Sequence, residues 1–316
     1  MQKEADCLNL LGTAKSWKVS VVIPSYGRHE EVLRAVMSAL GQRLPPMEVI
    51  VSNDGPDPDK RNILKNLEDE RIRYVEAPRK GSAAATRNFG IKHAKGDWIA
   101  LLDDDDVWLP EKLEMQFLEL EKRGANKAIL AGVENVYFKD RLIMQRPKRV
   151  QTSGDGSLFD YLFSGSGGIN TSTIVAPTSL FLNYPFNEHV QPHEDWEWLL
   201  NAGKGLPFIV TGNIVCRRWL QPVQGLSHSG GFTYSWDWYL RNRDLIPPAN
   251  RAFFISKILF SKAAVDRKYS AMPLLFRELK SIHALTPANT AHLLQSLLFP
   301  PGLRRWLRHI ISKIKR

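Results

Sequence analysis

Short strand patterns alternate with helical patterns over the first hundred residues, and this alternation constrains the fold more than any other feature. The run 18–23 (KVSVVI), ended by Pro24, is typical of a buried strand, and apolar residues over 32–40 then recur at helical spacing. The alternation continues with expected strands at 47–54, 71–77 and 97–102 and an expected helix at 81–96. Such an alternation forms right-handed βαβ units. We therefore expect an α/β fold built on a parallel central sheet with helices packed against it.

Polar segments of unusual composition follow three of these expected strands. They are PSYGR at 24–28, NDGPD at 53–57 and the acidic run DDDD at 103–106. The carboxyl ends of parallel strands meet at one edge of a sheet, and ligands bind there. The topology therefore predicts a single site at which these three segments converge.

The acidic run is unusual in a chain whose formal net charge is +10. Adjacent carboxylates repel one another and raise one another's pKa values, so a bound cation would explain why they are gathered. Oxygen ligands suit Mg²⁺ or Mn²⁺, and Mg²⁺ is commonly held by one or two carboxylates together with substrate phosphates. The alternative is a solvated acidic turn that caps the next helix. Its position directly after a buried strand favours a metal and diphosphate site.

Composition bounds the class of protein. The chain has 316 residues, of which 43% are hydrophobic and 24% charged, as in ordinary soluble proteins. Its two cysteines, Cys7 and Cys216, give neither a disulfide framework nor a paired metal motif, which indicates a reducing compartment. No signal peptide and no apolar run long enough to cross a bilayer are recognisable. A cytoplasmic protein is expected.

The rest of the chain is less regular. Further elements are expected as helices at 111–124 and 193–203, strands at 128–138, 171–177 and 208–220, and a Gly/Ser-rich mobile loop at 154–168. From roughly Phe232 onward, aromatic and basic helical patterns separated by prolines dominate. The expected organisation is an extension at 1–17, a domain at 18–230 with halves 18–125 and 126–230, and a helical region at 231–316.

The last fourteen residues form a separate feature. In 303–316 (LRRWLRHIISKIKR) apolar residues recur at helical spacing and six Lys or Arg residues accompany no acidic one. A basic amphipathic helix of this kind fits the surface of an anionic membrane. Packing on its own domain and an oligomer contact are the alternatives. Nothing else in the chain is suited to reading nucleic-acid bases, so no nucleic-acid partner is expected.

The four motifs VSVVIPSYGR, VSNDGPD, GSAAATRNFGIKHAKGDWIALLDDDDVWLPEKLE and FNEHVQPHEDWEW, taken in this order, resemble the family 2 glycosyltransferases. The resemblance covers roughly 18–229. It implies a GT-A fold with a mostly parallel sheet and the inverting transfer of a sugar from a nucleotide diphosphate, usually UDP, assisted by Mn²⁺ or Mg²⁺. Together with the basic tail, it suggests a glycan or lipid-linked acceptor, such as a lipopolysaccharide intermediate, at the inner face of the cell membrane.

The resemblance also implies roles for residues of the donor site. The nucleotide pocket would be lined by Pro24, Ser25, Tyr26 and Arg28. Asp54 would accept a hydrogen bond from uracil, although Asn53 stands where the family usually has another aspartate. Arg87 would neutralise phosphate charge. In the D-x-D element, Asp103 would lie near the ribose or the metal, Asp104 would be the variable middle position, and Asp105 would ligate the metal. Asp106 would shape the following turn or support the metal indirectly.

A general base and a third metal ligand complete the expected site. By resemblance Asp195 is the base, with Glu194 beside it, whereas on the residues alone this pair could equally cap a helix. His228 stands where some family members complete the metal site, although a lone histidine is more often structural or solvated. Two other functions stay open: an inactive sugar-nucleotide or glycan-binding module at the membrane, and a nucleotidyltransferase. The second would need a glycine- and lysine-rich phosphate loop, which PSYGR is not.

Overall fold

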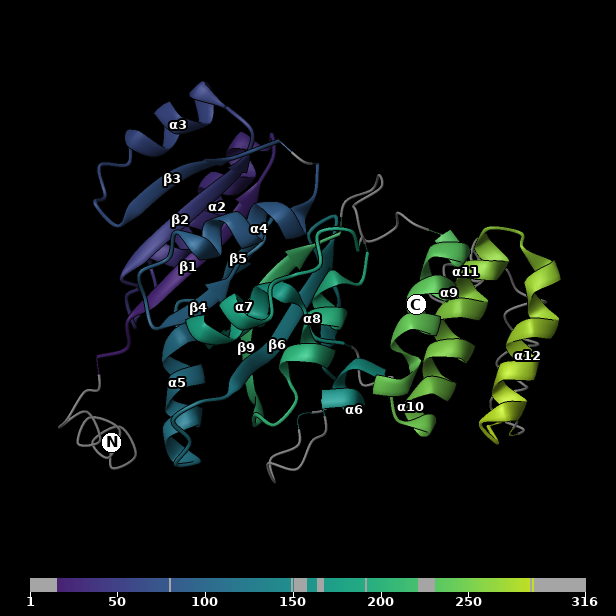
Figure 1. The fold of residues 1–316 in the computed structure, drawn as a ribbon. Helices are drawn as coiled ribbons and strands as arrows, with labels where there is room; N and C mark the ends of the chain where they lie inside the picture. The colour runs from purple at the N-terminus through teal and green to yellow at the C-terminus, as the bar shows by residue number, and fades with distance from the viewer. Residues whose placement is uncertain are drawn as a thin grey trace, which may run out of the picture.

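The computed structural model describes residues 16–79, 81–148, 150, 158–163, 168–190, 192–220, 231–284 and 286. These residues form a sheet of nine strands, with helices on both of its faces and a group of helices at one end (Figure 1). The strands are β1 (Val19–Ser25), β2 (Glu48–Asp54), β3 (Ile72–Ala77), β4 (Trp98–Leu101), β5 (Asp106–Trp108), β6 (Ile129–Phe138), β7 (Arg141–Arg146), β8 (Val175–Pro177) and β9 (Phe208–Trp219). The expected α/β class is confirmed.

The first half of the sheet is parallel, in the order β3-β2-β1-β4. Beyond β4 the order continues β8-β6-β9-β5, with β7 paired to β6. In this half β6 and β9 are parallel to each other, whereas β5, β7 and β8 pair antiparallel with their neighbours. The carboxyl ends of β1, β2 and β4 share one edge, and the three polar segments leave the sheet there.

Alternating side chains of β1 divide the core between the two faces of the sheet. Val21 and Ile23 belong to one apolar cluster, and Val22 belongs to the other. The helices of this half are α2 (His29–Leu40), α3 (Pro58–Lys65), α4 (Ala83–Lys92) and α5 (Lys112–Lys122). Buried residues of α2, α3 and α5 join the first cluster, and those of α4 join the second. Because both faces are covered, the edge of the sheet is left for the site.

The middle of the chain departs from expectation in two places. The segment 154–168, expected as a loop, contains α6 (Leu158–Phe163), and the single strand expected at 171–177 is the 3₁₀ turn η2 (Thr171–Thr173) followed by β8. Apolar side chains of α6 are buried in the second cluster, which favours a helix there despite the flanking Gly and Ser residues. The helices that follow η2 are α7 (Thr178–Asn183) and α8 (Glu194–Ala202), the latter as expected.

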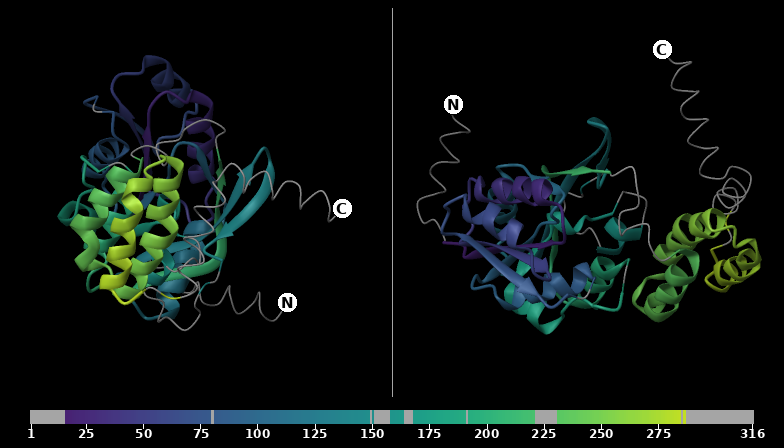
Figure 2. Two further views of the ribbon diagram at one scale, coloured as in Figure 1. Left: turned by 90° about the vertical axis from the view of Figure 1, so that its right-hand side faces the viewer. Right: turned by 90° about the horizontal axis from the view of Figure 1, so that it is seen from above.

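The helices after residue 230 group at one end of the molecule (Figures 1 and 2). They are α9 (Gly231–Asn242), η4 (Arg243–Leu245), α10 (Pro248–Phe253), the π-helical turn η5 (Phe254–Leu259), α11 (Phe260–Val265), η6 (Tyr269–Ala271) and α12 (Met272–Ser281). The expected division of the chain at residue 230 stays a prediction. Within the described part of the chain, no helix is both long and apolar enough to span a membrane.

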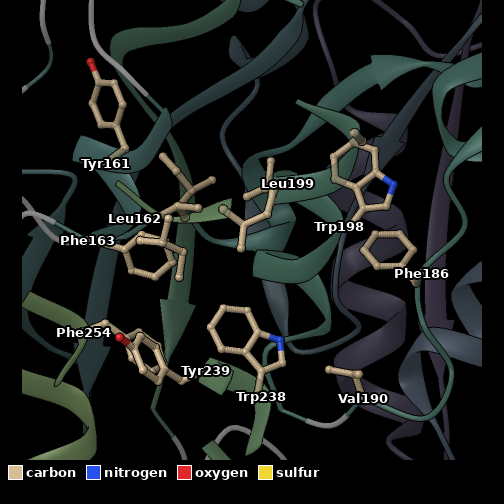
Figure 3. Packing of buried hydrophobic residues seen from close by; sticks show 14 of the residues in the cluster. Tyr161, Leu162, Phe163, Phe186, Val190, Trp198, Leu199, Trp238, Tyr239 and Phe254 are labelled. Carbon is tan, nitrogen blue, oxygen red and sulfur yellow. The ribbon is translucent and has the colours of Figure 1, made fainter. Parts of the chain in front are cut away.

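Aromatic packing joins this helical group to the sheet half. Figure 3 shows Trp198 of α8 beside Phe186, and their ring centroids lie 5.5 Å apart. From the helical group, Trp238 of α9 packs against Trp196 of α8 at 6.2 Å between ring centroids. Trp198 and Trp238 are buried in the same apolar cluster. The helix that begins with Glu194 and Asp195 is therefore held from both sides.

Candidate active site

The four aspartates after β4 have different surroundings. Asp104 is turned inward, where its carboxylate accepts hydrogen bonds from Ser25 Oγ at 2.8 Å and from Arg28 Nη1 at 2.9 Å. Its side chain is only 8% exposed, and burial raises its pKa to about 6. The side chains of Asp103 and Asp105 are 33% and 24% exposed. One carboxylate is thus buried and two are accessible, and the D-x-D roles of these residues stay a prediction.

Asp106 is a structural residue of the sheet. It begins β5 opposite Arg218 of β9, and its Oδ2 accepts hydrogen bonds from Ser172 Oγ at 2.6 Å and Asn170 Nδ2 at 3.1 Å. Asn170 also donates to Glu134 Oε2. Burial raises the pKa of Asp106 well above the ordinary range for a carboxyl group. These contacts order the segment 170–172, a role that is neither of the two considered for Asp106 from the sequence.

The turn after β1 directs Arg28 at the aspartates. Gly27 and Arg28 both have a positive φ, of 60° and 51°, so the chain reverses sharply before α2. Arg28 Nη1 then reaches Asp105 Oδ2 at 2.7 Å as well as Asp104. Tyr26 is 57% exposed, with the Arg79 guanidinium 4.8 Å from its ring centroid. Pro24 is buried within β1.

Lys60 of α3 lies beside the site although no motif in the sequence indicates it. Its side chain is fully buried, and Nζ donates to Asn53 Oδ1 at 2.6 Å and to Ser25 Oγ at 2.8 Å. Burial lowers its pKa. Asn53, the departure from the family pattern, thus accepts a hydrogen bond from an ammonium group. The neighbouring Asp54 Oδ2 accepts a hydrogen bond from Gly81 N at 2.8 Å.

Arg87 of α4 connects the aspartates to the start of α8. Its side chain is 2% exposed, its Nη2 donates to Asp103 Oδ1 at 3.0 Å, and its Nη1 lies 3.8 Å from Glu194 Oε1. The ring of Phe186 lies under the guanidinium carbon, 4.9 Å from its centroid. Among the residues that the structure describes, neither Nε nor Nη1 has a hydrogen-bond acceptor. A buried cation with unused donors is suited to an anionic ligand.

The acidic pair at the start of α8 lies on the other side of Arg87. Burial and the charge of Asp195 raise the pKa of Glu194 to about 7. Burial also raises the pKa of Asp195, against the hydrogen bonds that its carboxylate accepts from Trp196 N at 2.8 Å and from Thr171 Oγ1 at 3.3 Å. Perturbed carboxylates in a cleft are typical of general acids and bases.

Capping of α8 by this pair stays an alternative, because Asp195 Oδ1 accepts a hydrogen bond from Trp196 N in the first turn of the helix at 2.8 Å. The N-cap position of α8 is held by His193, which makes no side-chain capping hydrogen bond and has a φ of 84°. Its Nε2 lies 2.9 Å from Ser235 Oγ of α9, so the residue before the acidic pair is fixed by the helical group. The ring of Trp196 stacks on His193 at 4.7 Å between centroids, and Trp198 is buried as expected for a core residue.

The donor set fits a divalent cation. In the described part of the chain, no group of three or more His, Cys, Asp or Glu side chains could hold a metal on its own. Asp103 and Asp105 nevertheless offer accessible carboxylates, and burial together with the charge of Asp103 raises the pKa of Asp105. Two carboxylates completed by phosphate oxygens and water are a common arrangement for Mg²⁺. His228 and the expected tail helix at 303–316 lie outside the described residues.

Comparison with known proteins agrees with this geometry. The model of the family described as "Glycosyl transferase family 2" matches residues 20–188. The chain belongs to this family. The matched range includes β1 to β4, the four aspartates and Arg87, and it ends before Glu194 and Asp195.

The chain is also similar to three individual proteins. It is 34% identical over 184 residues to an uncharacterized glycosyltransferase of Rickettsia bellii, covering 56% of this chain but only 25% of that protein. It is 36% identical over 106 residues to WfaP of Escherichia coli, named as a UDP-Glc:alpha-D-GlcNAc-diphosphoundecaprenol beta-1,3-glucosyltransferase, covering 33% of this chain and 42% of WfaP. TarS 1-349 of S. aureus, solved with UDP-GlcNAc, superposes with a TM-score of 0.63 at 16% identity, covering 89% of this chain and 85% of that one. This last likeness shows the GT-A fold.

Proposed function

We propose that this protein is a metal-dependent, inverting glycosyltransferase that moves a sugar from a nucleotide diphosphate to a hydroxyl group of a glycan or lipid-linked acceptor. The observation that carries the proposal is the place of Arg87. It is buried between the accessible aspartates and the Glu194–Asp195 pair, with two nitrogen atoms that donate to no acceptor in the described residues. A donor diphosphate would supply those acceptors.

In the proposed reaction, proton removal takes place on one side of Arg87 and departure of the diphosphate on the other. Asp195 accepts the proton of the acceptor hydroxyl as its oxygen bonds to the anomeric carbon. The bond from that carbon to the diphosphate oxygen breaks, and its electron pair leaves with the nucleotide diphosphate. Arg87 stabilises the charge that develops there, in a buried place where such charge stabilisation is strong. Attack opposite the leaving group inverts the anomeric configuration. Glu194, beside Asp195, helps to keep the pKa of the pair raised.

Asp103 and Asp105 would hold the Mn²⁺ or Mg²⁺ ion, which neutralises charge on the donor diphosphate. Asp104 is assigned no ligand role, because its side chain is only 8% exposed and its carboxylate also accepts a hydrogen bond from the buried Ser25. His228 is proposed as a further ligand. The ion pairs of Arg28 and Arg87 with these aspartates balance the acidic cluster before donor and metal bind.

The donor is proposed to be a UDP-sugar, with Tyr26 and Asp54 near the base and Arg28 near the diphosphate. Pro24 and Ser25 support this pocket from within β1. The exposed ring of Tyr26 is available for stacking. The names of two similar proteins support the assignment, because WfaP is named as using UDP-Glc and TarS 1-349 was solved with UDP-GlcNAc. The lipid-linked acceptor in the name of WfaP supports the same acceptor class here.

We further propose that the basic segment 303–316 holds the protein on the inner face of the cell membrane, where such acceptors are found. Its charge and apolar spacing support this assignment. Deleting the segment should move the protein from the membrane fraction to the soluble fraction while slow donor hydrolysis persists. An unchanged distribution would contradict the attachment and leave the transferase proposal intact.

The transferase proposal is tested with a panel of UDP- and GDP-sugars in the presence of Mn²⁺. We expect slow release of nucleotide diphosphate from at least one UDP-sugar and no release after Mn²⁺ is removed with a chelator. Binding measured by calorimetry on the same panel separates the alternatives, because an inactive binding module would bind a donor and never hydrolyse it. If no donor is bound or hydrolysed, the proposal fails.

A further inference from the structure

The hairpin of β6 and β7 carries an exposed apolar tip. Four large side chains there are between 38% and 51% exposed, namely those of Phe138, Leu142, Ile143 and Met144. The hairpin stands out from the body of the molecule in both views of Figure 2. Clustered exposed apolar residues mark a contact surface, whereas single ones need no explanation.

Both faces of this tip are open. All five residues from Arg141 to Gln145 are exposed, so neither face of β7 is covered by the described residues. A folded protein partner with a flat surface covers one face of a strand. A lipid surface surrounds a protruding tip on every side. The two-sided exposure therefore favours a membrane over a protein partner.

The charges at the tip match an anionic lipid surface. Lys139 and Arg141 are exposed next to the apolar side chains, with Asp140 as the one acidic residue from 138 to 144. Arg146, nearer the sheet, is ion-paired with Glu134 at 2.6 Å. Basic residues near a membrane are attracted by anionic headgroups. Among the described strands β7 pairs only with β6, so its outer edge has unpaired backbone groups, which restricts insertion to the headgroup region.

The base of the hairpin is fastened to the active site. Glu134 of β6 is fully buried and accepts a hydrogen bond from Asn170, which also donates to Asp106 of the aspartate run. Phe138 lies four residues further along the same strand, about 13 Å away at the usual rise of a strand. A tip at the headgroups would thus hold the site roughly that far above them.

We propose that the tip formed by residues 138–144 binds the headgroup region of an anionic membrane and sets the height of the active site above it. This proposal rests on the proposed function in one respect: the membrane contact would bring the site to a lipid-linked acceptor. Membrane contact itself needs neither donor nor turnover. Vesicle binding and donor hydrolysis can therefore fail independently of one another.

The test is sedimentation of the full chain with vesicles of phosphatidylglycerol and phosphatidylethanolamine, compared with pure phosphatidylcholine vesicles. We expect binding to the anionic vesicles, and a fall of at least about tenfold in the partition coefficient of the Leu142→Ser/Ile143→Ser/Met144→Ser variant. The matched control is Leu182→Ser/Val265→Ser/Leu274→Ser, which removes three exposed apolar side chains from α7, α11 and α12. The control should bind as the parent does.

A local probe separates the hairpin from the basic tail. A polarity-sensitive dye on Ile143→Cys, in a Cys7→Ser background with Cys216 buried, should shift to shorter wavelength when anionic vesicles are added. The same dye on Leu182→Cys should not shift. Equal binding by the hairpin variant and its parent, or no shift at position 143, would overturn the proposal. A change of oligomeric state in the hairpin variant with vesicle binding intact would instead assign the tip to a second copy of the chain.

Discussion

At the scale of single residues, the site is a series of ion pairs that links the aspartates after β4 to Glu194 at the start of α8. Arg28 forms ion pairs with both Asp104 and Asp105. Arg87 forms ion pairs with Asp103 and with Glu194. The two accessible aspartates, Asp103 and Asp105, are thus distinguished from Asp104 by geometry and not by residue type. Asn53 differs from the aspartate usual in the family, and its side-chain oxygen accepts a hydrogen bond from the Lys60 ammonium group.

This geometry gives a prediction for metal binding. Asp105→Asn should weaken Mn²⁺ binding in the presence of UDP by at least about tenfold, because it removes a ligand. Asp104→Asn should weaken it less, because Asp104 already accepts hydrogen bonds from Ser25 and Arg28. Titration followed by the paramagnetic signal of free Mn²⁺ measures both, with melting temperatures as the check on folding. A larger loss at Asp104 than at Asp105 would contradict the assignment.

Thr171 gives a second prediction, for the pH dependence. Its hydroxyl donates to Asp195 and stabilises the charged carboxylate, so Thr171→Val should raise the pKa of Asp195. Because the base must be deprotonated, activity rises with pH through that pKa. The acid limb of kcat/KM should therefore move upward by about one pH unit, the equivalent of one hydrogen bond to a charged group.

Two further variants make this shift specific. Thr171→Ser keeps the hydroxyl and should restore the parent profile. Thr173→Val removes a hydroxyl of the same turn, which donates to the Asn170 carbonyl and not to Asp195, so the limb should stay in place. A shift of equal size in Thr173→Val would show that the turn, and not the Thr171 hydroxyl, controls the base.

At the scale of elements, the site depends on packing that lies far from it. The acidic pair begins α8, and the residue before it, His193, is held by Ser235 of α9. Trp238 of α9 packs on the rings of His193 and Phe254 at 5.1 and 5.3 Å between centroids. The helical group thus positions the proposed base, although its own sequence contains none of the motif residues.

The effect of this packing can be measured on α9 itself. Trp238 is fully buried, so Trp238→Ala should lower the free energy of unfolding by about 3–5 kcal/mol. Leu240, on the same helix, is 40% exposed, and Leu240→Ala should change it by less than about 1 kcal/mol. Denaturant titration compares the two. A loss below about 1 kcal/mol for Trp238→Ala would contradict the packing described for α9.

The elements that the sequence predicted are those whose local pattern is strong. Strands β1, β2 and β4 are short β-branched or apolar runs, and α8 follows helical spacing. The local pattern alone is therefore sufficient to predict these four elements. Strand β5 was not predicted, because three residues beginning with an aspartate form a strand only through pairing with β9. The turn η2 and helix α6 were missed for a related reason, since burial in the second cluster decides α6 and the hydrogen bonds of Asp106 fix η2.

The same division holds within the site. Asp103, Asp105, Arg87 and Asp195 were expected from motifs read along the chain, and the structure brings Asp103, Arg87 and Glu194 together. Lys60, Thr171 and Asn170 were not expected, because their contacts join segments with no shared motif. Polar residues that act through long-range hydrogen bonds leave no periodic signal.

At the scale of the whole molecule, the account joins a donor site at one edge of the sheet to two proposed membrane contacts. The hairpin tip would set the height of the site, and the basic tail would retain the protein at the surface. Both contacts carry net positive charge, in agreement with a formal net charge of +10 for the chain. Raised salt should therefore weaken membrane binding before it affects donor binding at the buried Arg87.

The central claim is that Asp195 removes the proton of the acceptor hydroxyl. The most direct measurement compares sugar transfer and UDP binding in Asp195→Asn and in the parent protein. The account predicts that transfer falls by about 10²–10⁴-fold, as for the loss of a general base, while calorimetric affinity for UDP with Mn²⁺ is unchanged. Transfer at close to the parent rate by Asp195→Asn would contradict it.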